Sequence, residues 1–259
     1  MSTVSIYTLA SGSSGNATYL RFGECELLID CGISRREIGR KLATLGTSLD
    51  RLSAIFITHE HSDHIKGVEM LAKYDRIPIY GLAPSLHYMT KVDSSLFHVI
   101  RYGEGVTLQD VTITPFPTWH DSLASCGYVL SYQGERFGVC TDLGRPTEEV
   151  TDALFGCRAV LLEANYDPIM LKYGAYPPFL KSRIAGNYGH LANDVSAKFA
   201  AFLTKSGTER ILLGHLSKEN NTPEKAEAAV RAVLEKESLT LSLAVADRYG
   251  ITELISTEC

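Results

Sequence analysis

The stretch that decides the fold is Phe56-Ile57-Thr58-His59-Glu60-His61-Ser62-Asp63-His64. Three imidazoles and the Asp63 carboxylate follow an apolar, β-branched run that is typical of a strand. His59 and His61 are two residues apart and can hold one metal ion from a loop just past the strand end, whereas Asp63 and His64 suit a second ion. These are ligands of zinc, iron and manganese. A polar loop that is rich in histidine by chance is the alternative, and four fixed positions of rare residues disfavour it.

The composition indicates one globular domain over residues 1–259. The chain is 45% hydrophobic and 21% charged, which is enough for a sizeable core. Its net charge of -5 demands no anionic partner, although a local basic patch is compatible with it. No apolar run is long enough to cross a membrane, and residues 1–7 lack the pattern of a signal peptide. Six cysteines without a C-x-x-C pair predict a cytoplasmic location, and the oligomeric state stays open.

Alternating apolar residues predict a series of strands, with helices between several of them. A helix is expected to begin after Ser34, another to span 65–74 and a third to open at Pro84. A glycine-serine loop, Ala10 to Asn16, joins the first two strands and lacks the ending of a P-loop. The last third is expected to be mainly helical, broken by one strand. The predicted strands are 4–9, 17–22, 26–30, 55–58, 77–80, 97–100, 112–118, 126–132, 135–140, 159–162 and 210–213.

Polar residues follow the ends of six of these strands, and we expect them to meet at one rim of a sheet structure. Any one of them alone could be a turn residue or a helix cap. Six together, beside a metal motif, are hard to explain as turns. They are Asp30, His59, His120, Asp142, Glu163 and His215.

The order D…H-x-H-x-D-H…H…D…H resembles the metallo-β-lactamase fold superfamily. The resemblance implies an α/β (α+β) fold, a four-layer αββα sandwich with two divalent metal ions (Zn, Mn or Fe) at one edge. It implies that Asp142 bridges the ions and that Asp30, beneath the site, orients a ligand histidine. The implied ligands of the first ion are His59, His61 and His120, and those of the second are Asp63, His64 and His215.

Further motifs narrow the branch of this superfamily. Segments 161–165 and 189–194 resemble the glutamate–histidine pair of the ribonuclease Z group, and segments 10–16, 176–184 and 214–221 are most similar to the YycJ/WalJ family. That similarity implies a nuclease, with DNA exonuclease as the leading activity. Only 73 positions separate Asp142 from His215, too few for the inserted domain of the β-CASP nucleases. No glycine/proline-rich arm precedes Glu163, which argues against transfer-RNA processing.

The implied mechanism is hydrolysis of a phosphodiester by a hydroxide shared between the two metals. Asp63 is expected to orient the nucleophile, and His190, polarised by Glu163, to protonate the leaving oxygen. The alternatives are a helix-start role for His190 and a helix cap for Glu163. Phosphate contacts are expected from loop and basic residues, against the alternatives of a plain turn and a solvated surface. These residues are Ser13, Asn16, Lys181, Arg183 and Lys218.

Two other functions stay open at this point. One is a metallohydrolase of the same fold that acts on a thioester, a lactone or a small cyclic phosphodiester. The other is a non-catalytic regulatory module, which the complete ligand set disfavours. A nucleic acid is the expected partner, with DNA favoured over RNA. The sequence alone does not choose between DNA and RNA, between exonuclease and endonuclease, or among the metals.

Overall fold

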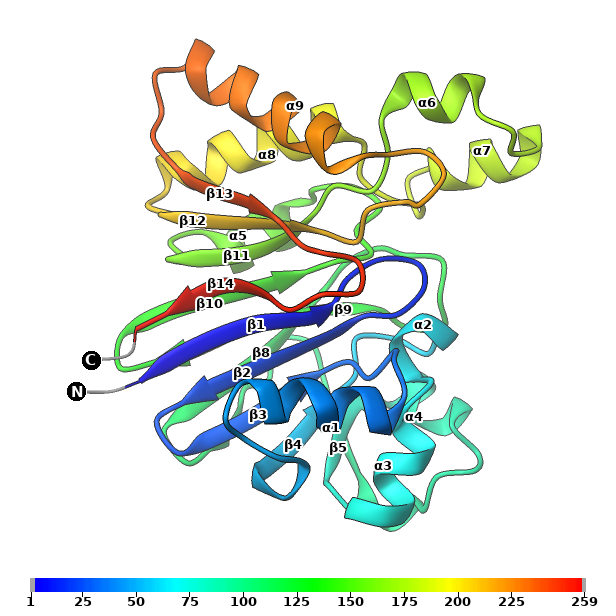
Figure 1. The fold of residues 1–259 in the computed structure, drawn as a ribbon, viewed down its shortest axis with the longest axis vertical. Coiled ribbons are helices and arrows are strands. Elements are labelled where there is room, and N and C mark those ends of the chain that lie inside the picture. The colour runs from blue at the N-terminus through cyan, green and yellow to red at the C-terminus, as the bar shows by residue number, and fades with distance from the viewer. Residues whose placement is uncertain (1–2, 258–259) are drawn as a thin grey trace.

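A computed structural model describes residues 3–257 as two seven-stranded sheets packed face to face, with helices on both outer sides (Figure 1). This arrangement confirms the predicted αββα sandwich. The first sheet has the order β14-β1-β2-β3-β4-β5-β6, and the second has the order β13-β12-β11-β10-β9-β8-β7. The strand bounds are β1 Val4–Ala10, β2 Ala17–Phe22, β3 Cys25–Ile29, β4 Leu52–Phe56, β5 Ile79–Leu82, β6 Phe97–Ile100, β7 Val106–Leu108, β8 Val111–Pro117, β9 Cys126–Tyr132, β10 Glu135–Cys140, β11 Ala159–Glu163, β12 Arg210–Gly214, β13 Ser242–Val245 and β14 Thr252–Ser256.

The helices form the two outer layers. Helices α1, α3 and α4 lie outside the first sheet, and α5, α8 and α9 lie outside the second (Figure 1). Ser34 caps α1 as predicted, because its Oγ accepts a hydrogen bond from the Glu37 amide. No helix within residues 3–257 is long and apolar enough to span a bilayer. The helices are α1 Arg35–Thr44, α2 Ser62–Ile65, α3 Val68–Asp75, α4 Ala83–Tyr88, α5 Glu148–Leu154, α6 Pro168–Tyr173, α7 Pro178–Ile184, α8 Asn193–Lys205 and α9 Pro223–Lys236, with short 3₁₀ turns at Leu49–Arg51 and Ser94–Leu96.

The core lies mainly between the two sheets. Phe56 of the first sheet and Tyr128 of the second are fully buried there, with their rings edge to face and 5.6 Å between centroids. Burial of a side chain of this size contributes about 1.5–3 kcal/mol. Two further apolar clusters fill the space between each sheet and its helices. Strands such as β3 and β11 are therefore covered on both faces, which explains their continuous apolar sequences.

Parallel pairing brings several strand ends to one edge of the sandwich. Strands β10, β11 and β12 are parallel neighbours, with Glu163 at the end of β11 opposite Gly214 at the end of β12. Strands β3 and β4 are parallel in the other sheet. The side chains that follow these strands therefore meet at the same edge, as the strand-end pattern predicted.

Two expectations about the elements were wrong. The predicted helix over 65–74 is divided at Gly67 into α2 and α3, because the Gly67 amide donates to the Cys31 carbonyl at 2.7 Å. A Cβ on Gly67 would lie 2.3 Å from the Ile33 carbonyl oxygen, so the backbone between α2 and α3 packs directly against the loop after β3. The last third contains two strands beyond the one expected, β13 and β14. Strand β14 pairs with β1 from the other end of the chain, a contact that local patterns do not reveal.

Candidate metal centre

The first ligand set comes from the loop after β4 and the loop after β8. His59 and His61 precede α2, and His120 follows β8 by three residues. One nitrogen from each of these three imidazoles lies within 4.8 Å of the others. The rings of His59 and His61 are nearly perpendicular, with centroids 4.5 Å apart. The structure therefore brings together the three histidines that the sequence assigned to one ion.

The second set combines the first turn of α2 with the end of β12. Ligand atoms of Asp63, His64 and His215 also lie within 4.8 Å of one another. Asp142 lies between the two sets: its Oδ2 is 3.2 Å from His64 Nε2, and its Oδ1 is 3.6 Å from His120 Nε2. This is the position that a bridging carboxylate needs.

Buried polar atoms without partners test whether these residues fit a metal. His59 Nε2, His215 Nε2 and Asp142 Oδ2 are inaccessible to solvent and have no hydrogen-bond partner among residues 3–257. Leaving such a group unsatisfied costs about 1–3 kcal/mol. All three point into one cluster of imidazoles and carboxylates, which is a donor set that divalent metal ions accept. The residues therefore fit divalent metal ions.

Each of three ligand histidines is held through its other ring nitrogen. His64 Nδ1 donates to Asp30 Oδ2 at 2.7 Å, His120 Nδ1 donates to the Gly189 carbonyl at 2.9 Å, and His215 Nδ1 donates to Glu163 at 2.8 Å. Such contacts fix the tautomer and leave Nε2 as the nitrogen that could bind a metal ion. Asp30 also accepts from the amide and hydroxyl of Thr58 at 2.9 and 2.8 Å, so this carboxylate is held in place.

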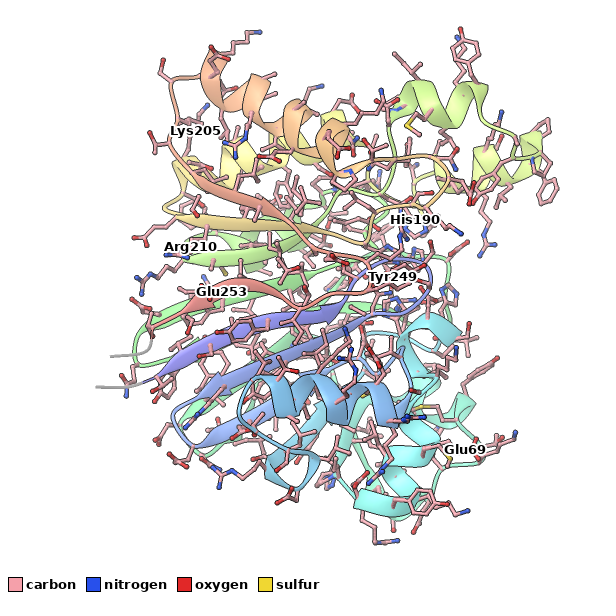
Figure 2. The ribbon with its side chains drawn as sticks, viewed as in Figure 1. Glu69, His190, Lys205, Arg210, Tyr249 and Glu253 are labelled. Atoms are coloured by element: carbon pink, nitrogen blue, oxygen red, sulfur yellow. The ribbon has the colours of Figure 1, made fainter. Side chains whose placement is uncertain are left out.

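Glu163 and His190 form the hydrogen-bonded pair that the sequence suggested. His190 Nδ1 donates to Glu163 Oε1 at 2.8 Å. The other carboxylate oxygen accepts the Leu143 and Leu191 amides, each at 3.0 Å, so the fully buried Glu163 cannot turn. The His190 side chain is 20% exposed and lines the cavity above the ligands. Figure 2 shows it on the side of the molecule opposite Arg210, where β12 begins.

The charges in this cluster stabilise one another. Burial alone would raise the pKa of Glu163, but His190 and His215 outweigh it and lower that pKa to about 2. Burial alone would lower the pKa of His215, but Asp142, Asp63 and Glu163 outweigh it and raise it to about 10. Burial and the neighbouring His64 hold the pKa of His59 well below its usual range. Burial alone would also raise the pKa of Asp142, but His215 and His64 outweigh it and lower that pKa well below its usual range. The Glu163 and Asp142 carboxylates are therefore ionised.

Backbone strain is concentrated here. Asp30, Trp119, Asp142 and His215 all have positive φ, between 51° and 60°, in a region that residues other than glycine seldom adopt. Three of them are predicted site residues, and the fourth precedes His120. Strained conformations persist where the surrounding structure fixes them, and they cluster at functional sites. This backbone conformation at the strand ends directs the side chains of Asp30, Asp142 and His215 toward the candidate metal centre.

The cavity over the ligands has a volume of about 230 Å³. Ser13 and Arg183, two of the residues expected to contact phosphate, line it. Asn16 is buried instead, with its amide nitrogen 3.0 Å from His64 Nε2 and 3.3 Å from Asp63 Oδ2. Lys181 donates to the Lys172 carbonyl at 2.9 Å, and Lys218 is exposed outside the residues that line the cavity.

Sequence reasoning missed several residues that support the site. Thr58 links Asp30 to His59, and the buried Glu60 accepts the Leu123 amide at 2.7 Å and so ties the loop of His120 to the motif loop. Asn165 donates to the His215 carbonyl at 2.8 Å. Asp121 forms an ion pair with Arg183. The one signal in the sequence that could have found these supporting residues is their position, because each lies within two residues of a predicted site residue. They are Thr58, Glu60, Asp121 and Asn165.

Comparisons with known proteins agree with this geometry. The family described as "Beta-lactamase superfamily domain" matches residues 26–216, which include every ligand position proposed above. The chain is 38% identical to "Exodeoxyribonuclease WalJ" of Streptococcus pneumoniae serotype 2 (strain D39 / NCTC 7466), over 84% of this chain and 83% of that protein. It is 32% identical to "Exodeoxyribonuclease YycJ" of Bacillus anthracis, over 88% of each chain.

A solved structure shares the fold. The metallo-beta-lactamase fold protein YhfI from Bacillus subtilis superposes with a TM-score of 0.76, over 98% of this chain and all of that one, at 15% sequence identity. At that identity the likeness concerns the arrangement of strands and helices alone.

Proposed function

This chain belongs to the beta-lactamase superfamily domain family and is a metal-dependent hydrolase, and from that premise we propose that it is an exonuclease acting on DNA. The relatives named exodeoxyribonucleases cover more than four fifths of the chain, and histidines and carboxylates that could hold divalent metal ions lie together, which supports the proposal. The observation that carries the proposal is the Glu163–His190 pair beside that centre.

We propose that the centre holds two divalent ions, drawn from zinc, manganese and iron. One would be held by His59, His61 and His120, the other by Asp63, His64 and His215, with Asp142 shared between them. Bound there, such ions would supply Lewis acidity toward a phosphate oxygen and would lower the pKa of water.

His190 is proposed as the general acid. Hydrolysis of a phosphodiester expels a sugar alkoxide, which is a poor leaving group unless it receives a proton. Since His190 Nδ1 is engaged by Glu163, Nε2 is the atom free to hold that proton. A positioned acid of this kind accelerates a reaction by about 10²–10⁴-fold. A thiolate, the leaving group of a thioester, needs no such proton, so the pair favours the phosphodiester.

The remaining cavity residues are proposed to position the substrate. Asp63 lines the cavity with its carboxylate partly exposed, where it can accept a hydrogen bond from the attacking water. Ser13 and Arg183 both line this cavity and can bind phosphate oxygens of the substrate. Asp121 forms an ion pair with Arg183 and partly neutralises its positive charge. Arg183 would therefore bind a phosphate fully only after it exchanges the Asp121 carboxylate for that phosphate.

We also propose that the protein acts in the cytoplasm. Cys25, Cys31, Cys126, Cys140 and Cys157 are all buried and unpaired, a state that a reducing compartment maintains.

The test is hydrolysis of labelled linear and covalently closed circular DNA by protein loaded with manganese or zinc, beside RNA of the same sequence. Release of mononucleotides from linear DNA, with circular DNA intact and RNA cut more slowly, is the expected result. Thioester and lactone substrates are assayed in parallel. Inert DNA together with turnover of a thioester or a lactone would overturn the proposal.

A further inference from the structure

A helical segment stands out from the sandwich at the edge that carries the metal centre. It comprises α6, α7, the connection between them and the four residues after α7, residues 168–188 in all, and Figure 1 shows both helices extending beyond the sheets. Its inner side is held by a small apolar cluster, in which Tyr176 and Ile184 pack with Leu171 and Tyr166. The Lys181 ammonium also donates to the Lys172 carbonyl and so ties α7 to α6.

The outer side of this segment carries large apolar side chains that cover no core. Tyr173 and Phe179, on either side of the connection, are each 75% exposed, and Ile169 is 65% exposed. None of the three belongs to an apolar core cluster of the described residues. Their truncation therefore leaves these core clusters intact, and their exposure marks a surface for interaction.

The charge of the segment fits a polyanion. The chain has 30 acidic residues among 259, yet residues 168–193 contain none. The same stretch contains Lys172, Lys181 and Arg183, and Lys172 Nζ lies 5.3 Å from the centre of the Tyr173 ring. Exposed aromatic rings between lysines, without carboxylates, are the features by which proteins hold single-stranded nucleic acid.

The segment is continuous with the metal cavity. Tyr176, Leu180 and Ile184 line that cavity from α7 and the connection before it. At the end of the segment, the Tyr188 ring stacks on Trp119 with centroids 5.6 Å apart. The Tyr188 carbonyl also accepts a hydrogen bond from the Asp121 amide at 3.0 Å. A nucleic-acid strand bound across residues 168–188 would thus extend along the protein surface into the cavity of the candidate metal centre.

We propose that residues 168–188 form a platform for a single nucleic-acid strand, whose bases stack on Tyr173 and Phe179 while its phosphates pass Lys172 and Lys181. This inference rests on the proposed nuclease function and specifies the form of its substrate. Bases inside a duplex are already stacked on one another and cannot reach these rings. The platform therefore favours single strands and unpaired ends over blunt duplexes.

The test compares the double variant Tyr173→Ala/Phe179→Ala with the wild type, both as metal-loaded full chains. Binding is measured by fluorescence anisotropy with a labelled, phosphorothioate-linked oligothymidylate of about 12 nucleotides, a length within the usual site sizes. The double variant is expected to bind this strand at least about tenfold more weakly. Its binding to a blunt duplex, and its hydrolysis of bis(4-nitrophenyl) phosphate, should equal those of the wild type.

Tyr74→Ala is the matched control, because Tyr74 is 59% exposed on α3, at the other end of the molecule (Figure 1). It should change none of these values. Equal single-strand binding by the double variant and the wild type, with DNA still degraded, would overturn the platform and leave the nuclease proposal standing. A wild type that hydrolyses the small ester but neither binds nor cuts DNA would overturn both. Wild-type dimers that become monomers in the variant, with strand binding unchanged, would make the surface an interface between copies of this chain and overturn the platform.

Discussion

Glu163 Oε1 accepts hydrogen bonds from two histidines, each at 2.8 Å, and the two have different tasks. His215 is a proposed metal ligand, whereas His190 is the proposed proton donor. Replacement of Glu163 would therefore disturb metal binding and catalysis together. His190 is not itself a proposed ligand, although its Nδ1 lies 3.8 Å from Asp142 Oδ1, so the chemistry is tested at His190 with the metal content measured beside it.

His190→Ala should slow DNA hydrolysis by about 10²–10⁴-fold while the metal content per chain is unchanged. The reason is that the sugar alkoxide loses its proton donor. An ester with a 4-nitrophenolate leaving group, which departs without a proton, should be hydrolysed at nearly the wild-type rate. Parallel kinetics on both substrates make the measurement, and an equal loss on both would contradict the assignment.

We predict that metal binding releases protons, because the carboxylates around His64 and His215 raise the pKa values of these two imidazoles. In the metal-free protein both pKa values are raised, that of His215 to about 10, so both imidazoles are protonated at pH 7. A metal ion binds only neutral imidazole, so about two protons should leave as the site fills. Calorimetric titration in two buffers of different ionisation enthalpy gives this number, and a value near zero would contradict the prediction.

The same shifts fix how the stability of the metal-free protein depends on pH. A pKa raised by folding stabilises the fold fully below the unfolded value of about 6.5 and loses that effect as the pH rises through the folded value. For His215 that window runs from about 6.5 to about 10. The metal-free chain should therefore lose stability as the pH rises over this range.

At the scale of single residues, the seven proposed ligands could be named from the dense motif over residues 59–64 and from the family resemblance, and the structure brings their side chains together. The sequence did not predict the role of Thr58, whose hydroxyl touches both Asp30 and His59. A threonine after a strand is common, and only its neighbours in space distinguish it. The contact of Asn16 with Asp63 joins loops 47 residues apart, which no local pattern encodes.

At the scale of elements, the close packing of three loops fixes the ligands. Gly32, after β3, lies against the loop of Asp63: a Cβ built on it would be 1.6 Å from the Asp63 carbonyl oxygen and 2.6 Å from the Asn16 amide. The Gly32 amide also donates to the Asn16 carbonyl at 2.7 Å. A side chain at this position must displace backbone rather than a flexible neighbour.

Gly32→Ala should therefore lose metal from the set that contains Asp63 and destabilise the fold by about 1–3 kcal/mol. Elemental analysis and urea unfolding measure the two effects. Gly39→Ala is the control, because Gly39 lies within α1 and its added methyl would meet only Leu49 at 3.4 Å. That control should be neutral or slightly stabilising. Full metal occupancy in Gly32→Ala would contradict the prediction, because it would show that the packing of Gly32 against the Asp63 and Asn16 loops does not position the ligands.

Elements with strong periodicity were predicted well, and those set by distant contacts were not. Strand β11 is a continuous apolar run and was predicted to within a residue. Strand β13 is short and half-exposed at the edge of its sheet, so it carries little pattern. Strand β14 depends on β1, whose Ser5 pairs with Ser256 from the other end of the sequence.

At the scale of the whole molecule, the metal centre joins the two sheets. His59 and His64 follow β4 of the first sheet, while His120, Asp142 and His215 follow β8, β10 and β12 of the second. Ions bound between them would link the halves of the sandwich. A single domain over residues 1–259 stays a prediction that fits this arrangement.

Metal removal should consequently lower the melting temperature. An ion present at 100 times its dissociation constant adds about 2.7 kcal/mol per site. For a chain of this size that corresponds to about 5–10 °C. Differential scanning calorimetry before and after chelation measures it, with Asp142→Ala expected to show little shift. Identical melting of the loaded and the metal-free wild type would contradict a link between the sheets.

The most direct test of the account is the rate of nucleotide release from linear single-stranded DNA as manganese is added back to the chelated protein. The rate should rise from zero and level off at about two ions per chain, with covalently closed circular DNA uncut throughout. Activity without metal, or cleavage of the circle at the rate of the linear strand, would contradict a metal-dependent exonuclease.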